Sequence, residues 1–82
     1  MIMPSKHISF AESLLGLGSY ILEQLNNPKR IEELWSIYEK VNNTPKYPAY
    51  HSFDNFILAL DFLYLIGSIE INERHEIFYV PH

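Results

Sequence analysis

Apolar residues recur at helical spacing in the first half of the chain. A period near 3.6 residues predicts one helix over about 10–25 and a second over about 28–41. Ser9 with Glu12 fits a capping box at the start of the first helix. Pro28 suits the first turn of the second helix. The residues predicted to face the core are Phe10, Leu14, Leu17, Ile21 and Leu25 in the first helix, and Ile31, Leu34, Ile37, Tyr38 and Val41 in the second.

A third stretch, 53–66, is apolar on nearly all of its sides and predicts a helix with no fully polar face. At about 100° per residue, the face predicted to enter the core consists of Phe53, Phe56, Ile57, Leu60, Leu63 and Tyr64. The opposite side of the helix, here called the outer face, combines apolar and polar residues: Leu58, Phe62 and Leu65 with Asp54, Asn55 and Asp61.

A helix that is apolar all round is expected to be buried on both sides. In so short a chain, a partner protein is one source of the second cover, and we predict that the six outer-face residues form a protein-binding surface. An apolar centre with a polar rim is the usual composition of such a surface. Two alternatives are cover by the first helix or the hairpin of the same chain, and a homodimer.

The C-terminal residues 68–80 predict a β-hairpin. Ser68 to Asn72 alternates at period two, and 77–80 is β-branched and aromatic. Gly67 fits the left-handed position after the third helix. Three helices and a hairpin predict a mainly α, winged-helix-like single domain over 1–82. A three-helix bundle with a hairpin flap is the alternative.

Composition narrows the possible functions. The net charge is −4, and the six basic residues are dispersed along the chain, which does not favour binding to phosphate backbones. A DNA-reading helix needs Arg, Lys, Asn or Gln, and the third helix offers only Asn55, next to Asp54. The absence of cysteine, of a signal-peptide pattern and of a long apolar run predicts a soluble cytoplasmic protein that neither enters membranes nor binds nucleic acid by itself.

Candidate catalytic patterns are weak. Residues 16–19 read Gly-Leu-Gly-Ser, but no strand precedes them and no Lys-Ser/Thr follows, which argues against a phosphate loop. The polar residues 73–76 read as a solvated hairpin tip rather than a metal site. Asp54 and Asp61 fit the rim of an apolar contact better than an acid/base pair. We therefore expect no enzyme activity, no cofactor and no metal.

Three segments together resemble a bacterial family: 27–28 (Asn-Pro), 33–35 (Glu-Leu-Trp), and the run 53–70, which begins Phe-Asp-Asn-Phe-Ile-Leu-Ala-Leu-Asp and ends Gly-Ser-Ile-Glu. The chain resembles, from about 10 to 80, the middle component of ABC-three-component systems, relatives of the Lamassu defence systems. The resemblance implies a non-enzymatic adaptor between an SMC-like ABC ATPase and an effector, often a nuclease, in a system acting against phage or plasmids. It transfers no catalytic residue.

Two other classes of function stay open from the residues. One is a winged-helix DNA-binding regulator or DNA-bridging subunit, which would need a basic face. The other is a stand-alone regulator such as an antitoxin, which neighbouring genes would distinguish from an adaptor.

Overall fold

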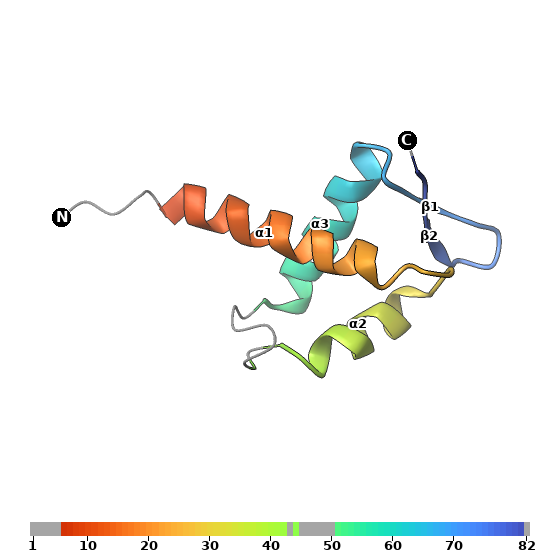
Figure 1. Cartoon of the computed structure of the whole chain (residues 1–82), viewed down its shortest axis with the longest axis horizontal. Helices are drawn as coiled ribbons and strands as arrows, with labels where there is room; N and C mark the ends of the chain where they lie inside the picture. Colours follow the sequence, from red (N-terminus) through yellow and green to blue (C-terminus); the bar gives the residue numbers. More distant parts are fainter. Residues whose placement is uncertain (1–5, 43, 45–50, 82) are drawn as a thin grey trace.

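Three helices precede a short antiparallel hairpin (Figure 1). The computed structural model describes residues 6–42, 44 and 51–81, with the side chains of the first helix described from Ser13 onward. The elements are α1 (Lys6–Glu23), α2 (Ile31–Glu39), α3 (Phe53–Leu65), β1 (Ile69–Ile71) and β2 (Ile77–Tyr79). This order confirms the predicted mainly helical fold with a C-terminal hairpin.

The ends of α1 differ from the prediction. The helix begins at Lys6, so Ser9 lies inside it and the capping box predicted there is wrong. The side chains of Ser9, Phe10 and Glu12 lie outside the described residues. At the other end, the amides of Gln24 and Leu25 donate to carbonyls three positions back, at 3.0 and 3.1 Å. This tighter turn ends α1 at Glu23, before the predicted residue 25.

The segment before α2 is extended and pairs with the hairpin. The Lys29 N–H donates to the Ile77 carbonyl at 3.0 Å, and the Ile77 N–H donates to the Lys29 carbonyl at 2.7 Å. α2 therefore begins at Ile31, and the prediction that Pro28 occupies its first turn is wrong. The Glu33 carboxylate accepts the Arg30 N–H at 2.9 Å at the start of the helix. Because the α1–α2 connection is bonded to β2, the hairpin is not a free flap, which is consistent with the winged-helix-like domain.

The two ends of α3 agree with the sequence prediction. At the first turn, the Ser52 Oγ accepts the Asn55 N–H at 3.2 Å. At the end, Gly67 has a φ of 80°, and its N–H donates to the Tyr64 carbonyl at 3.0 Å. The Ser68 N–H reaches the Leu63 carbonyl at 2.9 Å. This pair of bonds is a Schellman motif, which ends the helix and directs the chain into β1.

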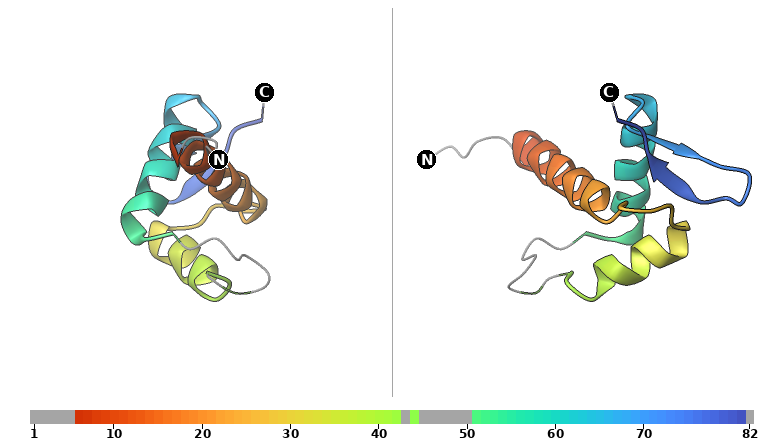
Figure 2. Two further views of the ribbon diagram at one scale, coloured as in Figure 1. Left: turned by 90° about the vertical axis from the view of Figure 1, so that its left-hand side faces the viewer. Right: turned by 45° about the vertical axis from the view of Figure 1, so that its right-hand side comes forward.

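One hydrophobic core joins all five elements. α1 crosses α3 and packs against it, α2 lies below both helices in Figures 1 and 2, and the hairpin lies on the right-hand side in Figure 1. The two long helices are in contact at Gly18, where a Cβ built on the glycine would lie at an ordinary van der Waals distance, 3.4 Å, from the Leu63 side chain. The buried apolar residues are Leu17, Ile21, Leu25, Leu34, Tyr38, Phe56, Ala59, Leu60, Leu63, Ile69 and Ile77.

Candidate protein-binding surface

The buried side of α3 is rotated from the predicted one. It consists of Phe56, Ala59, Leu60 and Leu63. Phe53 and Tyr64 are 45% and 57% exposed, and Ile57 is half-buried, so the prediction that Phe53 and Tyr64 enter the core is wrong. The reason is that α1 packs on the side of α3 that carries Ala59 and Leu63, which turns the opposite flank toward solvent.

The apolar residues of the outer face are accessible to solvent. Leu58, Phe62 and Leu65 are 49%, 45% and 81% exposed. Asp54 and Asp61 lie exposed among them. Within the described part of the chain, α1 borders Phe62 and β1 borders Leu65, but neither element buries them. Five of the six residues predicted to bind a partner are therefore available on one side of the molecule.

Asn55, the sixth, lies elsewhere. Its side chain is half-buried and turned toward the buried ring of His51, with Asn55 Nδ2 at 3.4 Å from His51 Nδ1. Asn55 thus belongs to the junction before α3 rather than to the exposed rim.

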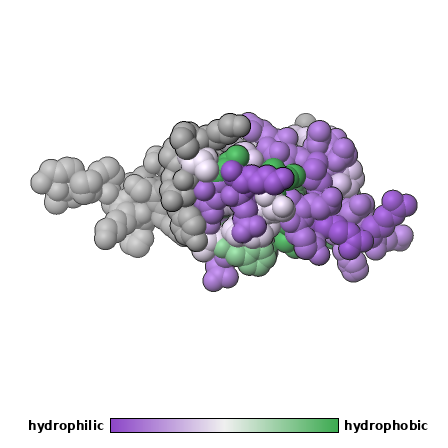
Figure 3. Space-filling view, turned by 90° about the horizontal axis from the view of Figure 1, so that it is seen from below, coloured by the Kyte–Doolittle hydropathy of each residue, from purple (hydrophilic) through white to green (hydrophobic). Residues whose placement is uncertain are grey.

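The outside of α2 has a different character. Glu32, Glu33, Ser36, Glu39 and Lys40 are exposed there. The side of the molecule seen from below is mostly hydrophilic, with smaller hydrophobic areas (Figure 3). Exposed apolar side chains of α3 thus lie in a molecule whose second helix presents a charged surface.

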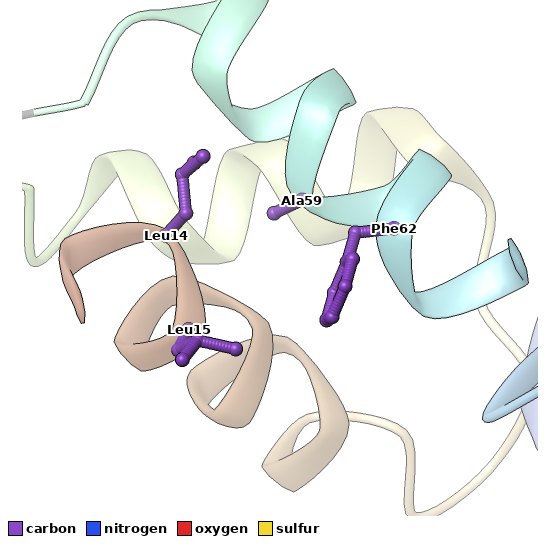
Figure 4. A pocket seen from close by; sticks show the side chains of 4 residues that line it. All are labelled: Leu14, Leu15, Ala59 and Phe62. Atoms are coloured by element: carbon purple, nitrogen blue, oxygen red, sulfur yellow. The ribbon is translucent and has the colours of Figure 1, made fainter. Parts of the chain in front are cut away.

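A hollow between α1 and α3 adjoins the outer face. It has a volume of about 280 Å³ and is lined by Leu14, Leu15, Ala59 and Phe62 (Figure 4). Leu15 is 55% exposed at its edge. The hollow can accept an apolar side chain without desolvating a charged group. The contribution of α1 to this surface was not predicted from the sequence.

Among the basic residues that the structure describes, Lys29 is bonded to the loop that follows α1. The Lys29 ammonium donates to the Gln24 carbonyl at 2.8 Å, to Asn26 Oδ1 at 2.9 Å and to Asn27 Oδ1 at 3.0 Å. It thereby satisfies acceptors at the end of α1 rather than projecting freely into solvent. The outer face of α3 carries the exposed carboxylates of Asp54 and Asp61.

A buried polar network lies next to this surface and was not identified from the sequence. His51 is 2% exposed, and its Nε2 lies 2.8 Å from Ser13 Oγ. Its backbone is joined to Asn42, which accepts the His51 N–H at 3.2 Å and donates to the His51 carbonyl at 3.0 Å. The Tyr38 hydroxyl donates to the same Asn42 at 2.8 Å. The network thus links α1, the end of α2 and the start of α3.

Burial favours the neutral form of His51. Desolvation lowers its pKa from the ordinary 6.5, and a hydrogen bond with Ser13 partly opposes that change. With Asn55 Nδ2 donating to Nδ1, the proton of the neutral ring is placed on Nε2, which can donate to Ser13 Oγ. The uncharged His51 thus links Ser13 of α1 and Asn42 after α2 to the start of α3.

In the part of the chain that the structure describes, no three or more His, Cys, Asp or Glu side chains are grouped so as to hold a metal ion. None of the described helices combines the length and the apolar character needed to cross a membrane.

The fold and its surface define a small helical domain with an exposed apolar side. By its sequence the chain belongs to the family described as ABC-three component (ABC-3C) system Middle Component 6, whose model matches residues 3–79. The match confirms the resemblance seen in the sequence, and the family description implies association with other components of such a system. No curated protein and no solved structure gave a match.

Proposed function

We propose that the chain is a non-enzymatic adaptor that connects an SMC-like ABC ATPase to an effector in a bacterial anti-phage or anti-plasmid system. Membership in the middle-component family supports the assignment to a three-component system. The adaptor role is supported by one structural observation, the exposed apolar outer face of α3. An apolar helix side of this kind is unfavourable in water and is typical of a surface that another protein covers.

The proposed contact with the ATPase has a central and a peripheral part. Phe62 is the anchor, because it belongs both to the outer face and to the hollow formed with Leu14 and Leu15. Asp54 and Asp61 form the rim, where charge affects the rate of association and its salt dependence more than the final affinity. Aromatic residues at the centre of an interface commonly contribute most of its binding free energy.

The experiment compares two phenylalanines of α3. Phe62→Ala should weaken co-purification with the co-expressed ATPase, with a loss of about 2 kcal/mol or more in binding free energy. Phe53→Ala is the matched control, because Phe53 is exposed to the same fraction, 45%, but contacts Trp35 at the other end of the helix. Both variants should stay folded by circular dichroism. Equal binding of both variants, or unfolding caused by Phe62→Ala alone, contradicts the proposed surface.

A second comparison isolates the rim charge. Asp61→Arg should slow association and change its salt dependence, whereas Glu73→Arg at the hairpin tip makes the same change of charge away from the surface. Size-exclusion chromatography of the isolated chain tests the homodimer alternative. If Phe62→Ala converts a dimer into a monomer and leaves ATPase binding unchanged, the outer face is a self-association surface.

A further inference from the structure

The outer edge of β1 presents backbone groups that are not used in the hairpin. The bonds from the Asn72 N–H to the Glu76 carbonyl and from the Val80 N–H to the Ser68 carbonyl, both 2.9 Å, bracket the ladder. With Glu70 opposite Phe78, the alternation of an antiparallel pair turns the N–H and C=O groups of Ile69 and Ile71 away from β2.

The opposite edge of the hairpin shows the contrast. On β2, the outward N–H and C=O of Ile77 are both bonded to Lys29. On β1, no hydrogen bond reaches the outward groups of Ile69 or Ile71 from any residue that the structure describes. One edge of the hairpin is therefore occupied by the chain itself, and the other is available to a further strand.

A hollow lined by both apolar and polar groups adjoins β1. It has a volume of about 390 Å³, and its lining comes from the end of α3 and from β1: Tyr64, Leu65, Gly67, Ile69, Glu70 and Ile71. Leu65 is 81% exposed and Ile71 is 55% exposed. A strand added to β1 would place alternate side chains beside Ile69 and Ile71, on the side that faces this hollow, while its intervening side chain would lie next to Glu70.

Glu70 discriminates between the strands that could bind. In a symmetric antiparallel pair of two β1 strands, centred on Glu70, the two copies of this carboxylate would lie directly opposite each other, which is unfavourable. A strand from another protein with Lys or Arg at that position would instead meet an opposite charge. The net charge of −4 adds to this preference for a basic partner over a second copy.

We propose that β1 binds, by strand addition, an extended segment of another component of the three-component system, in which apolar residues alternate with Lys or Arg. Backbone hydrogen bonds to Ile69 and Ile71 supply the attachment, and the hollow beside Tyr64 and Leu65 accepts the apolar side chains. The proposal rests on the proposed function only for the source of the segment, since the edge and the hollow lie in the chain itself.

The first test uses the full chain and two synthetic peptides. In one peptide valine alternates with lysine, and in the other valine alternates with glutamate. By NMR, the lysine peptide should shift the amide signals of Ile69 and Ile71 and slow their hydrogen exchange. The Glu70 amide points into the ladder and is the internal control. The lysine peptide should bind about fivefold more tightly than the glutamate peptide.

Two variants make the test specific. Ile71→Pro removes an outward donor but no bond of the β1–β2 ladder, so it should weaken the lysine peptide about tenfold while circular dichroism stays unchanged. Glu70→Lys, at an exposed position, should reverse the preference, so that the glutamate peptide binds more tightly than the lysine peptide. This variant tests the proposal if the proline variant does not fold. Absence of changes at Ile69 and Ile71, or binding with no dependence on Glu70, overturns the proposal.

The second test uses the complex co-purified with the ATPase and effector. Exchange of the Ile69 and Ile71 amides should be slower in the complex than in the free chain. If the complex forms and both amides exchange as fast as in the free chain, no segment of another component binds β1, while the proposed function stands. If no complex forms, the proposed function fails and the peptide titration alone decides the strand-addition site. Protection of both amides in the free chain together with a dimer on sedimentation would identify a second copy and overturn the proposal.

Discussion

α2 and α3 are both buried on one side, but their other sides differ. α2 buries Leu34 and Tyr38 and presents mostly charged residues to water. α3 buries Phe56, Ala59, Leu60 and Leu63, yet Leu58, Phe62 and Leu65 remain exposed on its outer face. Both helices serve the same core, so burial within the domain does not account for the apolar outer face of α3. The exposed side of α3 is therefore the better candidate for a protein-binding surface.

The largest expected effect concerns the inner sides, where the helices are alike. Leu34→Ala in α2 and Leu60→Ala in α3 should each lower the free energy of unfolding by about 2–5 kcal/mol, because both leave a cavity in the core. Leu58→Ala is the control for α3, since Leu58 is 49% exposed. Urea denaturation followed by circular dichroism measures all three. A loss for Leu58→Ala as large as for Leu60→Ala would show that the outer face is structural.

A smaller effect concerns the polar junction between the two helices. Because the pKa of buried His51 lies below 6.5 in the folded chain, the unfolded chain binds more protons just below that pH. The free energy of unfolding should therefore be level above about pH 6.5 and fall as the pH drops toward the folded-state pKa. His51→Gln should flatten the profile in that window. Denaturation at a series of pH values measures it.

A lysine introduced on the exposed side of either helix should change the free energy of unfolding only slightly. Leu65→Lys in α3 should alter the free energy of unfolding by no more than about 0.5 kcal/mol, since Leu65 is 81% exposed. The same variant should raise the solubility of the isolated chain, because it interrupts an exposed apolar surface. Ser36→Lys on the charged side of α2 should change neither quantity appreciably. Precipitation assays and thermal melts test this contrast, and equal solubility of the two variants would remove it.

The isolated chain is not expected to bind duplex DNA. At about 150 mM salt, the isolated chain should show no sub-micromolar binding to duplex DNA by fluorescence anisotropy. The acidic residues Asp54 and Asp61 on α3 and the engagement of Lys29 by its own loop are the reasons. Tight binding at that salt concentration would favour the DNA-binding alternative, with the contact on the hairpin and α2 rather than on α3.

Much of the fold could be predicted from local patterns. The extent of α3, its N-terminal cap at Ser52 and its termination before Gly67 follow from residues within a few positions of each boundary. The start of α2 could not, because it depends on the pairing of Lys29 with Ile77, which lies far along the chain. Similarly, no local pattern indicates that His51 meets Ser13 and Asn42.

The sequence by itself determined that three helices and a hairpin form, that α3 is apolar on both sides, and that the family is the middle-component family. Those properties reside in periodicity, capping residues and motif, which are local. Only the tertiary structure decided which side of α3 enters the core, because that depends on where α1 packs. It also decided that Phe62 shares a hollow with Leu14 and Leu15, and that β1 keeps one edge available while Lys29 occupies the edge of β2. Such features arise from contacts between distant segments, which a single helix or strand pattern does not encode.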